Sequence, residues 1–212
     1  RLAEQDRAFD VDTVVIADGS EFADALAGSY LANAKSAPIL LSFPQVIGVF
    51  LPEILPCVGF SQRNYHHVFD VYSHLVFTMD SVPPRPALRW AALLHDVGKP
   101  ETFSLDGEGV GHFYGHAARS AEIADSVLRR LRVDNATRET VTVLIRHHDF
   151  PLENEDRVLR RRLNKLGQER LFDLIALMRG DNLALAPEFR YRQEEYDALE
   201  VSLRRILSEK QC

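Results

Sequence analysis

The chain keeps a helical pattern of apolar residues from about residue 46 to its end, and this pattern most limits the folds it can adopt. Pro83, Pro84 and Pro86 separate two of the helical segments, and residues 102–111, which contain three glycines, predict a loop. The expected helices span 46–56, 67–80, 86–96, 114–132, 135–148, 157–166, 168–182 and 188–209. We therefore expect a mainly α fold, with a helical bundle over residues 46–212.

The first 45 residues have a different pattern. Residues 13–17 and 38–41 predict short strands, and an alanine-rich helix is expected between them over residues 21–34. This β-α-β order favours a parallel strand pair. Because such a short unit buries too little surface to fold alone, we expect residues 1–45 to be an N-terminal appendage that packs on the helical domain, pairs with another chain or is a remnant.

Composition narrows the function classes. The net charge of −6 argues against a dominant nucleic-acid surface, although a local basic patch is compatible with it. Two cysteines are too few for a disulfide framework or a zinc finger. No apolar run approaches the ~20 residues that span a bilayer, and no signal-peptide pattern is present. We expect no membrane partner and a cytoplasmic location.

All eight histidines lie between residues 66 and 148, which favours a shared site. His66 and His112 are expected to be ordinary packed or exposed side chains. His95 and Asp96 are adjacent at the end of an apolar helix, where Gly98 and the residues after it stop the helix. Adjacent residues cannot both face the core of a regular helix, but at its end both can turn toward one point. An imidazole and a carboxylate there suit a divalent metal.

Other helices offer partners for this pair. His67, Asp70 and His74 are spaced i, i+3, i+7, so they share one face of the helix expected over 67–80. A buried face with these side chains needs polar compensation, which a metal would supply. His116 opens another helix after a glycine turn.

Two further positions are open to more than one interpretation. His147 and His148 end a helix, where they are candidate ligands or a cationic last turn favoured by the helix dipole. Asp181 lies late in an apolar helix, where it is either a solvated acid or a carboxylate paired with a cation.

The order His74, His95-Asp96, Asp181 resembles the ligand pattern of the HD superfamily of metal-dependent phosphohydrolases. Residues 46–183 most resemble the HD domain of bacterial CCA-adding tRNA nucleotidyltransferases, through stretches 51–56, 58–60, 67–74, 91–100, 112–117 and 144–148. The 45 residues before this region are too few for the catalytic carboxylates and template-reading segments of those enzymes. We therefore do not expect CCA addition from this chain.

The resemblance implies a ligand set and a reaction. It implies that one divalent metal is held by His74, His95, Asp96 and Asp181. Asp96 would bridge to a second metal held by His116 and His148, with His147 as a further candidate ligand. Mixed His and carboxylate ligands suit Mn, Fe, Co, Ni or Zn. The expected reaction is hydrolysis of a phosphomonoester or a cyclic nucleotide phosphodiester by a metal-activated hydroxide, with Asp96 as the central catalytic residue.

Three supporting roles are expected around this centre. Lys99 is either a contact to a phosphate oxygen or an exposed lysine. Asp70, together with His67, would orient the His74 imidazole, although an acid at this spacing is itself a ligand in some trinuclear HD enzymes. The basic helix over 157–165 is either a solvated face or a docking surface for a phosphate-rich substrate, nucleotide or RNA, through residues that include Arg160 and Arg161.

Residues 12–32 and 37–41 resemble about half of a type-two cell-wall-binding repeat. Such repeats are longer and occur in tandem, so wall binding is not our main expectation. Two alternatives to the phosphohydrolase remain open from the sequence: a non-catalytic tRNA- or RNA-binding module, and a wall-associated protein.

Overall fold

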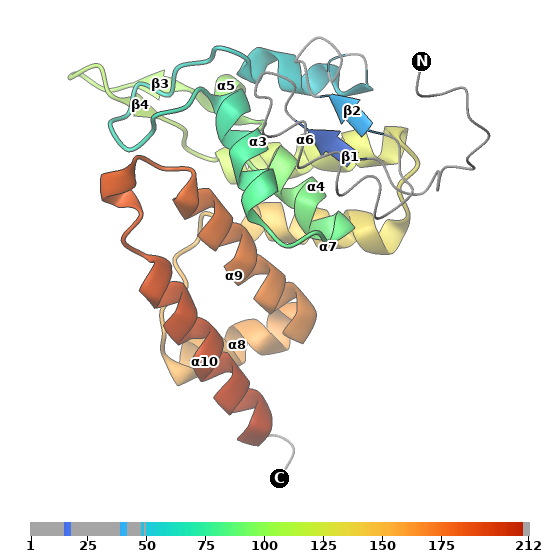
Figure 1. Cartoon of the computed structure of the whole chain (residues 1–212), viewed down its shortest axis with the longest axis vertical. Coiled ribbons are helices and arrows are strands. Elements are labelled where there is room, and N and C mark those ends of the chain that lie inside the picture. Colours follow the sequence, from blue (N-terminus) through green and yellow to red (C-terminus); the bar gives the residue numbers. More distant parts are fainter. Residues whose placement is uncertain (1–14, 18–38, 42–47, 49, 210–212) are drawn as a thin grey trace. The chain divides into compact units, whose positions relative to one another are not determined.

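The computed structural model describes residues 15–17, 39–41, 48 and 50–209, and the chain divides into two compact units, 1–55 and 56–212 (Figure 1). In the first unit, strand β1 (Val15–Ala17) pairs in parallel with β2 (Ile39–Leu41), and Val15 lies opposite Ile39. The predicted parallel pair is therefore confirmed. The helix predicted between the strands lies outside the described residues. So does most of the segment that resembles a wall-binding repeat, and its assignment to a separate domain over residues 1–45 stays a prediction.

The helical segment predicted over 46–56 is confirmed only in part: the described residues 48 and 50 are α-helical, but the second half differs. A 3-10 helix, η1 (Pro52–Cys57), occupies its second half. Pro56 lies inside this helix, and because proline has no N–H it cannot donate to an α-helical ladder. Pro56 thus removes a donor here, and the segment that the apolar pattern predicted as α-helical ends in a short 3-10 helix.

The second unit is a helical bundle, as predicted (Figure 1). Its described helices are α3 (Val71–Ser81), α4 (Pro86–Leu94), α5 (Lys99–Thr102), α6 (His116–Arg130), α7 (Asn135–His147), α8 (Asp156–Leu166), α9 (Gln168–Leu183) and α10 (Gln193–Glu209), with a short 3-10 helix η2 (Pro187–Phe189). No helix in the described part of the chain is long and apolar enough to cross a membrane.

Helix α4 is the central element of this bundle. It packs against α3, α6, α7 and α9, and α6 also packs along α7. Leu93 and Leu94 of α4 are buried against a core that includes Leu144 and Ile145 of α7 and Ile175 of α9. Because four helices surround α4, side chains at its end can meet side chains from several neighbours.

Helix α3 begins at Val71, and the predicted start near His67 was wrong. Asp70 caps the helix: its Oδ1 accepts a hydrogen bond from the Ser73 backbone N–H at 2.8 Å. His67 lies before this cap, so it does not share a helical face with His74. An aspartate directly before an apolar helical segment is itself a local start signal, because its carboxylate accepts from a backbone N–H of the first turn, and here it overrides the longer apolar pattern.

The predicted loop over 102–111 contains a small hairpin. Strand β3 (Ser104–Leu105) pairs antiparallel with β4 (Gly111–His112). The turn is closed by Asp106, whose Oδ1 accepts hydrogen bonds from the backbone N–H groups of Glu108 and Val110, both at 2.9 Å. This side-chain-to-backbone pattern orders a segment whose glycines suggested only irregular structure.

Candidate metal centre

His95 and Asp96 follow the last residue of α4, and both are buried. A tight turn forms there, because the Val97 N–H donates to the Leu94 carbonyl at 3.3 Å and the Lys99 N–H donates to the Asp96 carbonyl at 2.9 Å. The turn lets two adjacent side chains reach the same region. Asp96 belongs to both groups of potential metal ligands in this region.

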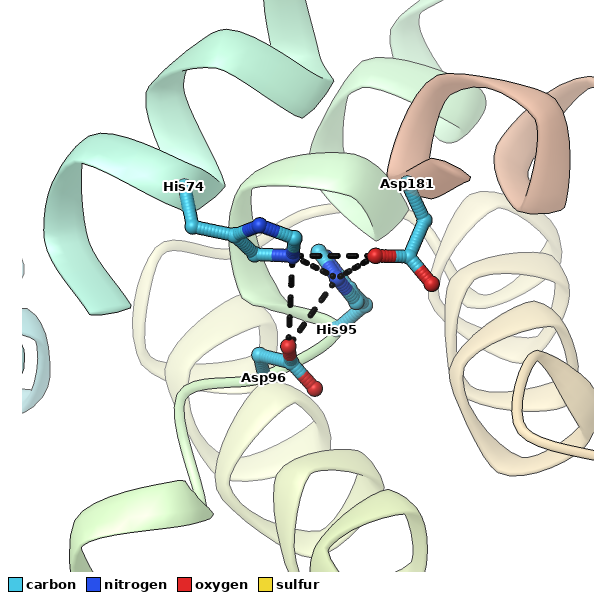
Figure 2. A group of neighbouring side chains, drawn as sticks. All are labelled: His74, His95, Asp96 and Asp181. Carbon is cyan, nitrogen blue, oxygen red and sulfur yellow. Dashed lines mark hydrogen bonds and ion pairs between the residues drawn. The ribbon is translucent and has the colours of Figure 1, made fainter. Parts of the chain in front are cut away.

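One group of side chains comes from two helices, α3 and α9, and from the turn after α4 (Figure 2). The Nε2 atom of His74, on α3, lies 3.2 Å from Nε2 of His95 and 3.0 Å from Oδ1 of Asp181, on α9. Oδ2 of Asp96 lies 3.4 Å from Nε2 of His74 and 3.3 Å from Nε2 of His95. Four potential ligand atoms therefore converge on one point.

A second group uses the other oxygen of Asp96. Its Oδ1 atom lies 3.3 Å from Nε2 of His116, at the start of α6, and 3.5 Å from Nε2 of His148, just after α7. The two Nε2 atoms are 3.4 Å apart. The carboxylate of Asp96 thus presents one oxygen to each group.

Backbone hydrogen bonds fix three of the imidazoles. In each, Nδ1 lies 2.6–2.8 Å from the carbonyl oxygen three residues earlier, for the pairs His95 with Ala92, His116 with Phe113 and His148 with Ile145. A carbonyl only accepts, so each Nδ1 carries the proton. In the neutral ring, Nε2 then presents its lone pair to the centre, which is the arrangement that metal-binding histidines use.

The donor atoms fit divalent metals. Ligands at about 2.1 Å from a metal lie roughly 3.0 Å apart in octahedral geometry and 3.4 Å apart in tetrahedral geometry. The distances between potential ligand atoms, 3.0 and 3.2 Å in the first group and 3.3 and 3.4 Å in the second, lie close to these values. Asp96 Oδ1 is buried and has no hydrogen-bond partner among the described residues. A buried acceptor without a donor is costly, and a cation would remove that cost.

The electrostatics of the groups also favour a cation. Burial alone would lower the pKa of His95, but Asp96 and Asp181 raise it to about 10. Burial opposes ionisation of Asp96, yet His95 and Lys99 hold its pKa well below the usual range. The pKa of Asp181 is likewise held low against burial, by hydrogen bonds from His74 and His95. Both carboxylates, the buried Asp96 and the partly exposed Asp181, therefore stay charged, and a metal cation bound there would replace the proton on Nε2 of His95.

Lys99 is buried, not exposed. Its Nζ donates to Oδ2 of Asp96 at 2.6 Å and to Oε1 of Gln62 at 2.7 Å. Gln62 was not predicted from the sequence, because no local pattern connects a loop glutamine with a lysine so far along the chain. The lysine ammonium therefore lies directly beside the two groups.

Asp70 and His67, which were predicted to orient the imidazole of His74, have other contacts in the structure. The carboxylate of Asp70 accepts hydrogen bonds from the backbone N–H groups of Ser73 and Gly59, so it serves the start of α3. The ring of His67 lies edge-on to that of His74, with centroids 5.3 Å apart. Burial and the neighbouring Lys99 lower the pKa of His67 to about 3, so this ring stays neutral.

The remaining candidates lie outside both groups. His147 contacts Phe150, with ring centroids 6.1 Å apart, and burial and the cations of Lys165 and Arg162 lower its pKa. On α8, Arg160 pairs with Glu209, and Arg161 is exposed. Of the two described groups that could hold a metal, neither includes His147, and neither arginine lines the pocket above them.

A pocket of about 510 Å³ opens over both groups. Its wall includes Asp96, Lys99, His116, His148 and Asp181. The volume lies within the range of roughly 300–1,000 Å³ that is typical of small-molecule sites. A ligand in this pocket would contact the candidate ligand atoms and the Lys99 ammonium together.

Comparison with known proteins agrees with this geometry. The family model of the HD domain matches residues 64–198, which contain every member of both groups. The chain is 35% identical over 145 residues to an A-adding tRNA nucleotidyltransferase of Deinococcus radiodurans, covering 66% of this chain and 33% of that protein. It is 39% identical over 152 residues to a CC-adding tRNA nucleotidyltransferase of Thermus thermophilus, covering 68% of this chain and 34% of that protein.

A multifunctional CCA protein of Azoarcus sp. is 35% identical over 102 residues, which is 46% of this chain and 24% of that protein. The chain thus spans about a third of the length of the first two relatives. The resemblance drawn from the sequence is confirmed for this region. Since the family model matches more than half of its residues, the chain belongs to the HD domain family.

Proposed function

We propose that this protein is a metal-dependent phosphohydrolase that cleaves a phosphomonoester or a cyclic nucleotide phosphodiester. The observation that carries the proposal is the position of Asp96. One buried carboxylate offers an oxygen to each of two histidine-containing groups, at the wall of a pocket large enough for a substrate. Two adjacent metal sites that share a carboxylate are a common basis of phosphate-ester hydrolysis.

Each group has its own part in this proposal. His74, His95, Asp96 and Asp181 would hold one divalent metal, and Asp96, His116 and His148 would hold the second. When bound, the metals supply Lewis acidity that makes water nucleophilic near neutral pH and offsets the charge of the phosphate. The donor set is compatible with Mn, Fe, Co, Ni or Zn.

Residues of the chain position the substrate around these ligands. Lys99 would donate a hydrogen bond to a phosphate oxygen, because its Nζ is held in the pocket wall by Asp96 and Gln62. The backbone carbonyls at Nδ1 of His95, His116 and His148 keep these rings from turning. Since this positioning is present before a substrate arrives, little reorganisation is required during the reaction.

Two adjacent histidines provide a matched test. The His148→Ala substitution removes a member of the second group, whereas His147→Ala changes a neighbour outside it. We expect protein purified without chelator to hold two metals per chain and to hydrolyse members of a phosphomonoester and phosphodiester panel. The His148→Ala variant should lose one metal and most turnover, and the His147→Ala variant should retain both. Elemental analysis, phosphate release from the monoesters and chromatography of the monoester formed from each diester measure these outcomes.

A chain that hydrolyses no phosphate ester with manganese, iron, cobalt, nickel or zinc contradicts the proposal. So does turnover that persists unchanged in a His95→Ala/Asp96→Ala double variant, since that variant removes the centre of both groups. Circular dichroism of each variant establishes that the helical bundle has formed.

A second candidate function is RNA binding without turnover. On helix α8, Arg157, Arg161 and Lys165 are exposed and form no ion pair with the residues that the structure describes. The relatives named above are tRNA nucleotidyltransferases. This reading predicts tRNA binding that weakens steeply with salt and with the Arg157→Ala/Arg161→Ala double substitution. Absence of binding at low salt excludes it.

A further inference from the structure

The pocket above the metal centre has an aromatic edge that no step of the proposed function uses. Tyr114, His112 and Tyr191 line the pocket but belong to neither group of candidate metal ligands. Tyr114 is 78% exposed and Tyr191 is 70% exposed. Large aromatic rings left in water at the mouth of a pocket are typical of surfaces that contact a ligand.

Tyr114 and His112 form a flat pair. Their rings are nearly parallel, with an interplanar angle of 5° and centroids 5.4 Å apart. The Tyr114 hydroxyl also lies 3.5 Å from Nδ1 of His112. Because the ring of Tyr114 is exposed and both residues line the pocket, a flat ligand can stack on Tyr114 without moving the backbone.

The hairpin before α6 holds this pair in place. Nε2 of His112 donates to Oδ2 of Asp106 at 2.8 Å. The other oxygen of Asp106 accepts hydrogen bonds from the backbone of the hairpin turn. His112 lies in strand β4, so its ring is anchored by both the sheet and the carboxylate. A ring that is fixed before binding loses little entropy when a ligand stacks on it.

The same pocket therefore combines two kinds of recognition. At one part of its wall, Lys99 and the candidate metal ligands suit a phosphate. At another part, the Tyr114–His112 pair offers a π-face. A nucleoside phosphate carries both a phosphate and a flat aromatic base, whereas a sugar phosphate or inorganic phosphate carries no flat ring. Stacking on an aromatic side chain accepts every base, because each base has a π-face.

We propose that Tyr114, backed by His112 and Asp106, is a stacking site for the nucleobase of a nucleoside phosphate whose phosphate lies at the metal centre. The proposal rests on the proposed function and extends its site. A free nucleotide and the terminal nucleotide of an RNA share this chemistry. The test therefore includes both.

The test measures binding, not turnover. The full chain is loaded with Zn²⁺, and AMP and ribose 5-phosphate, each as its non-hydrolysable phosphonate analogue, are titrated by ligand-observed NMR. We expect AMP to bind roughly tenfold more tightly than ribose 5-phosphate, as one stacked base provides. The Tyr114→Ala substitution should remove this preference, whereas Tyr114→Phe should keep it. Leu105→Ala, on the same hairpin and outside the pocket wall, is the matched control and should behave as the unsubstituted chain.

Four results would overturn the proposal. Equal affinity for AMP and ribose 5-phosphate, no AMP binding, or an AMP preference that survives Tyr114→Ala would each show that the base does not stack there. Loss of the preference in Tyr114→Phe would assign the site to the hydroxyl instead of the ring. A short oligoadenylate separates the two sources of the ligand. If it binds through Tyr114 with the same affinity as AMP, the site accepts nucleotides in general. If it binds through Tyr114 more tightly than AMP, the site accepts an RNA end. Since no turnover is measured, failure here leaves the phosphohydrolase proposal untouched.

Discussion

Replacing Gly98 with alanine tests whether the turn that carries Asp96 is held in place by its contact with α6. Gly98 follows Asp96 by two residues, and its N–H donates to Oγ of Ser120 at 2.9 Å. A Cβ atom at position 98 would lie 2.8 Å from the Ser120 backbone nitrogen, 3.0 Å from its Oγ and 3.1 Å from Cβ of Arg119. The first of these neighbours is helix backbone, which cannot rotate away. The turn and α6 must therefore separate.

The size of the effect follows from these distances. Ordinary contacts lie at about 3.5–4.0 Å, so the shift required is roughly 0.7 Å. Overpacking of this kind costs about 1–3 kcal/mol. Gly98 is not inside a long helix, so alanine brings no helix-propensity gain in compensation. For a domain of this size we expect the melting temperature to fall by roughly 5 °C.

The same shift should weaken the second metal group. His116 begins α6, while Asp96 lies in the turn that Gly98 belongs to, so the separation acts on the 3.3 Å distance between them. Metal sites tolerate about 0.2 Å of change in ligand distances. We expect roughly a 10- to 100-fold loss of affinity for the second metal.

Thermal unfolding by circular dichroism and a metal titration measure the two effects. Gly107→Ala is the matched control, because nothing lies within 4 Å of the added Cβ. A Gly98→Ala variant with unchanged melting temperature refutes the packing argument. A variant that melts earlier but binds both metals as before refutes the coupling between the turn and the second group.

Two further outcomes are expected. The Asp70→Ala substitution should reduce the free energy of unfolding by about 1–2 kcal/mol through loss of the α3 cap, whereas Asp70→Asn should retain most of that stability. Metal content should stay unchanged in both variants. Urea denaturation and elemental analysis measure these effects, and loss of a metal would make Asp70 a ligand. Burial raises the pKa of the Cys57 thiol to about 12, so iodoacetamide at pH 8 should leave Cys57 unmodified in the native protein and alkylate it after unfolding; peptide mapping that finds rapid native alkylation would contradict its burial.

Local signals in the sequence predicted most of the second unit. The helices over 135–147 and 168–183 were predicted to within a residue at each end, because apolar periodicity and capping act over a few neighbours. The predicted start of α3 was wrong although the local signal for the true start was present, because Asp70 caps the helix through its carboxylate. The hairpin was missed for a similar reason, since Asp106 orders the turn through its own side chain.

The placement of adjacent and distant side chains could not be predicted in the same way. His147 and His148 are the same residue type at the end of the same helix, and only the rotation of α7 about its axis decides that His148 faces Asp96. Arg160 and Arg161 suggested a substrate contact, but α8 packs on α9 and α10 and neither arginine reaches the pocket wall. The stacked pair of Tyr114 and His112 likewise depends on the hairpin geometry.

The sequence by itself determined that the second unit is helical, and its resemblance to the HD superfamily implied that His74, His95, Asp96 and Asp181 belong together. Helix periodicity and the order of ligand types are properties of the chain, so they can be read before it folds. The resemblance already implied that Asp96 bridges two sites, but only the tertiary structure decided which oxygen faces which group, and that Gln62 holds Lys99 beside Asp96. Those contacts join residues far apart in the chain, and their distances depend on how the helices pack around α4.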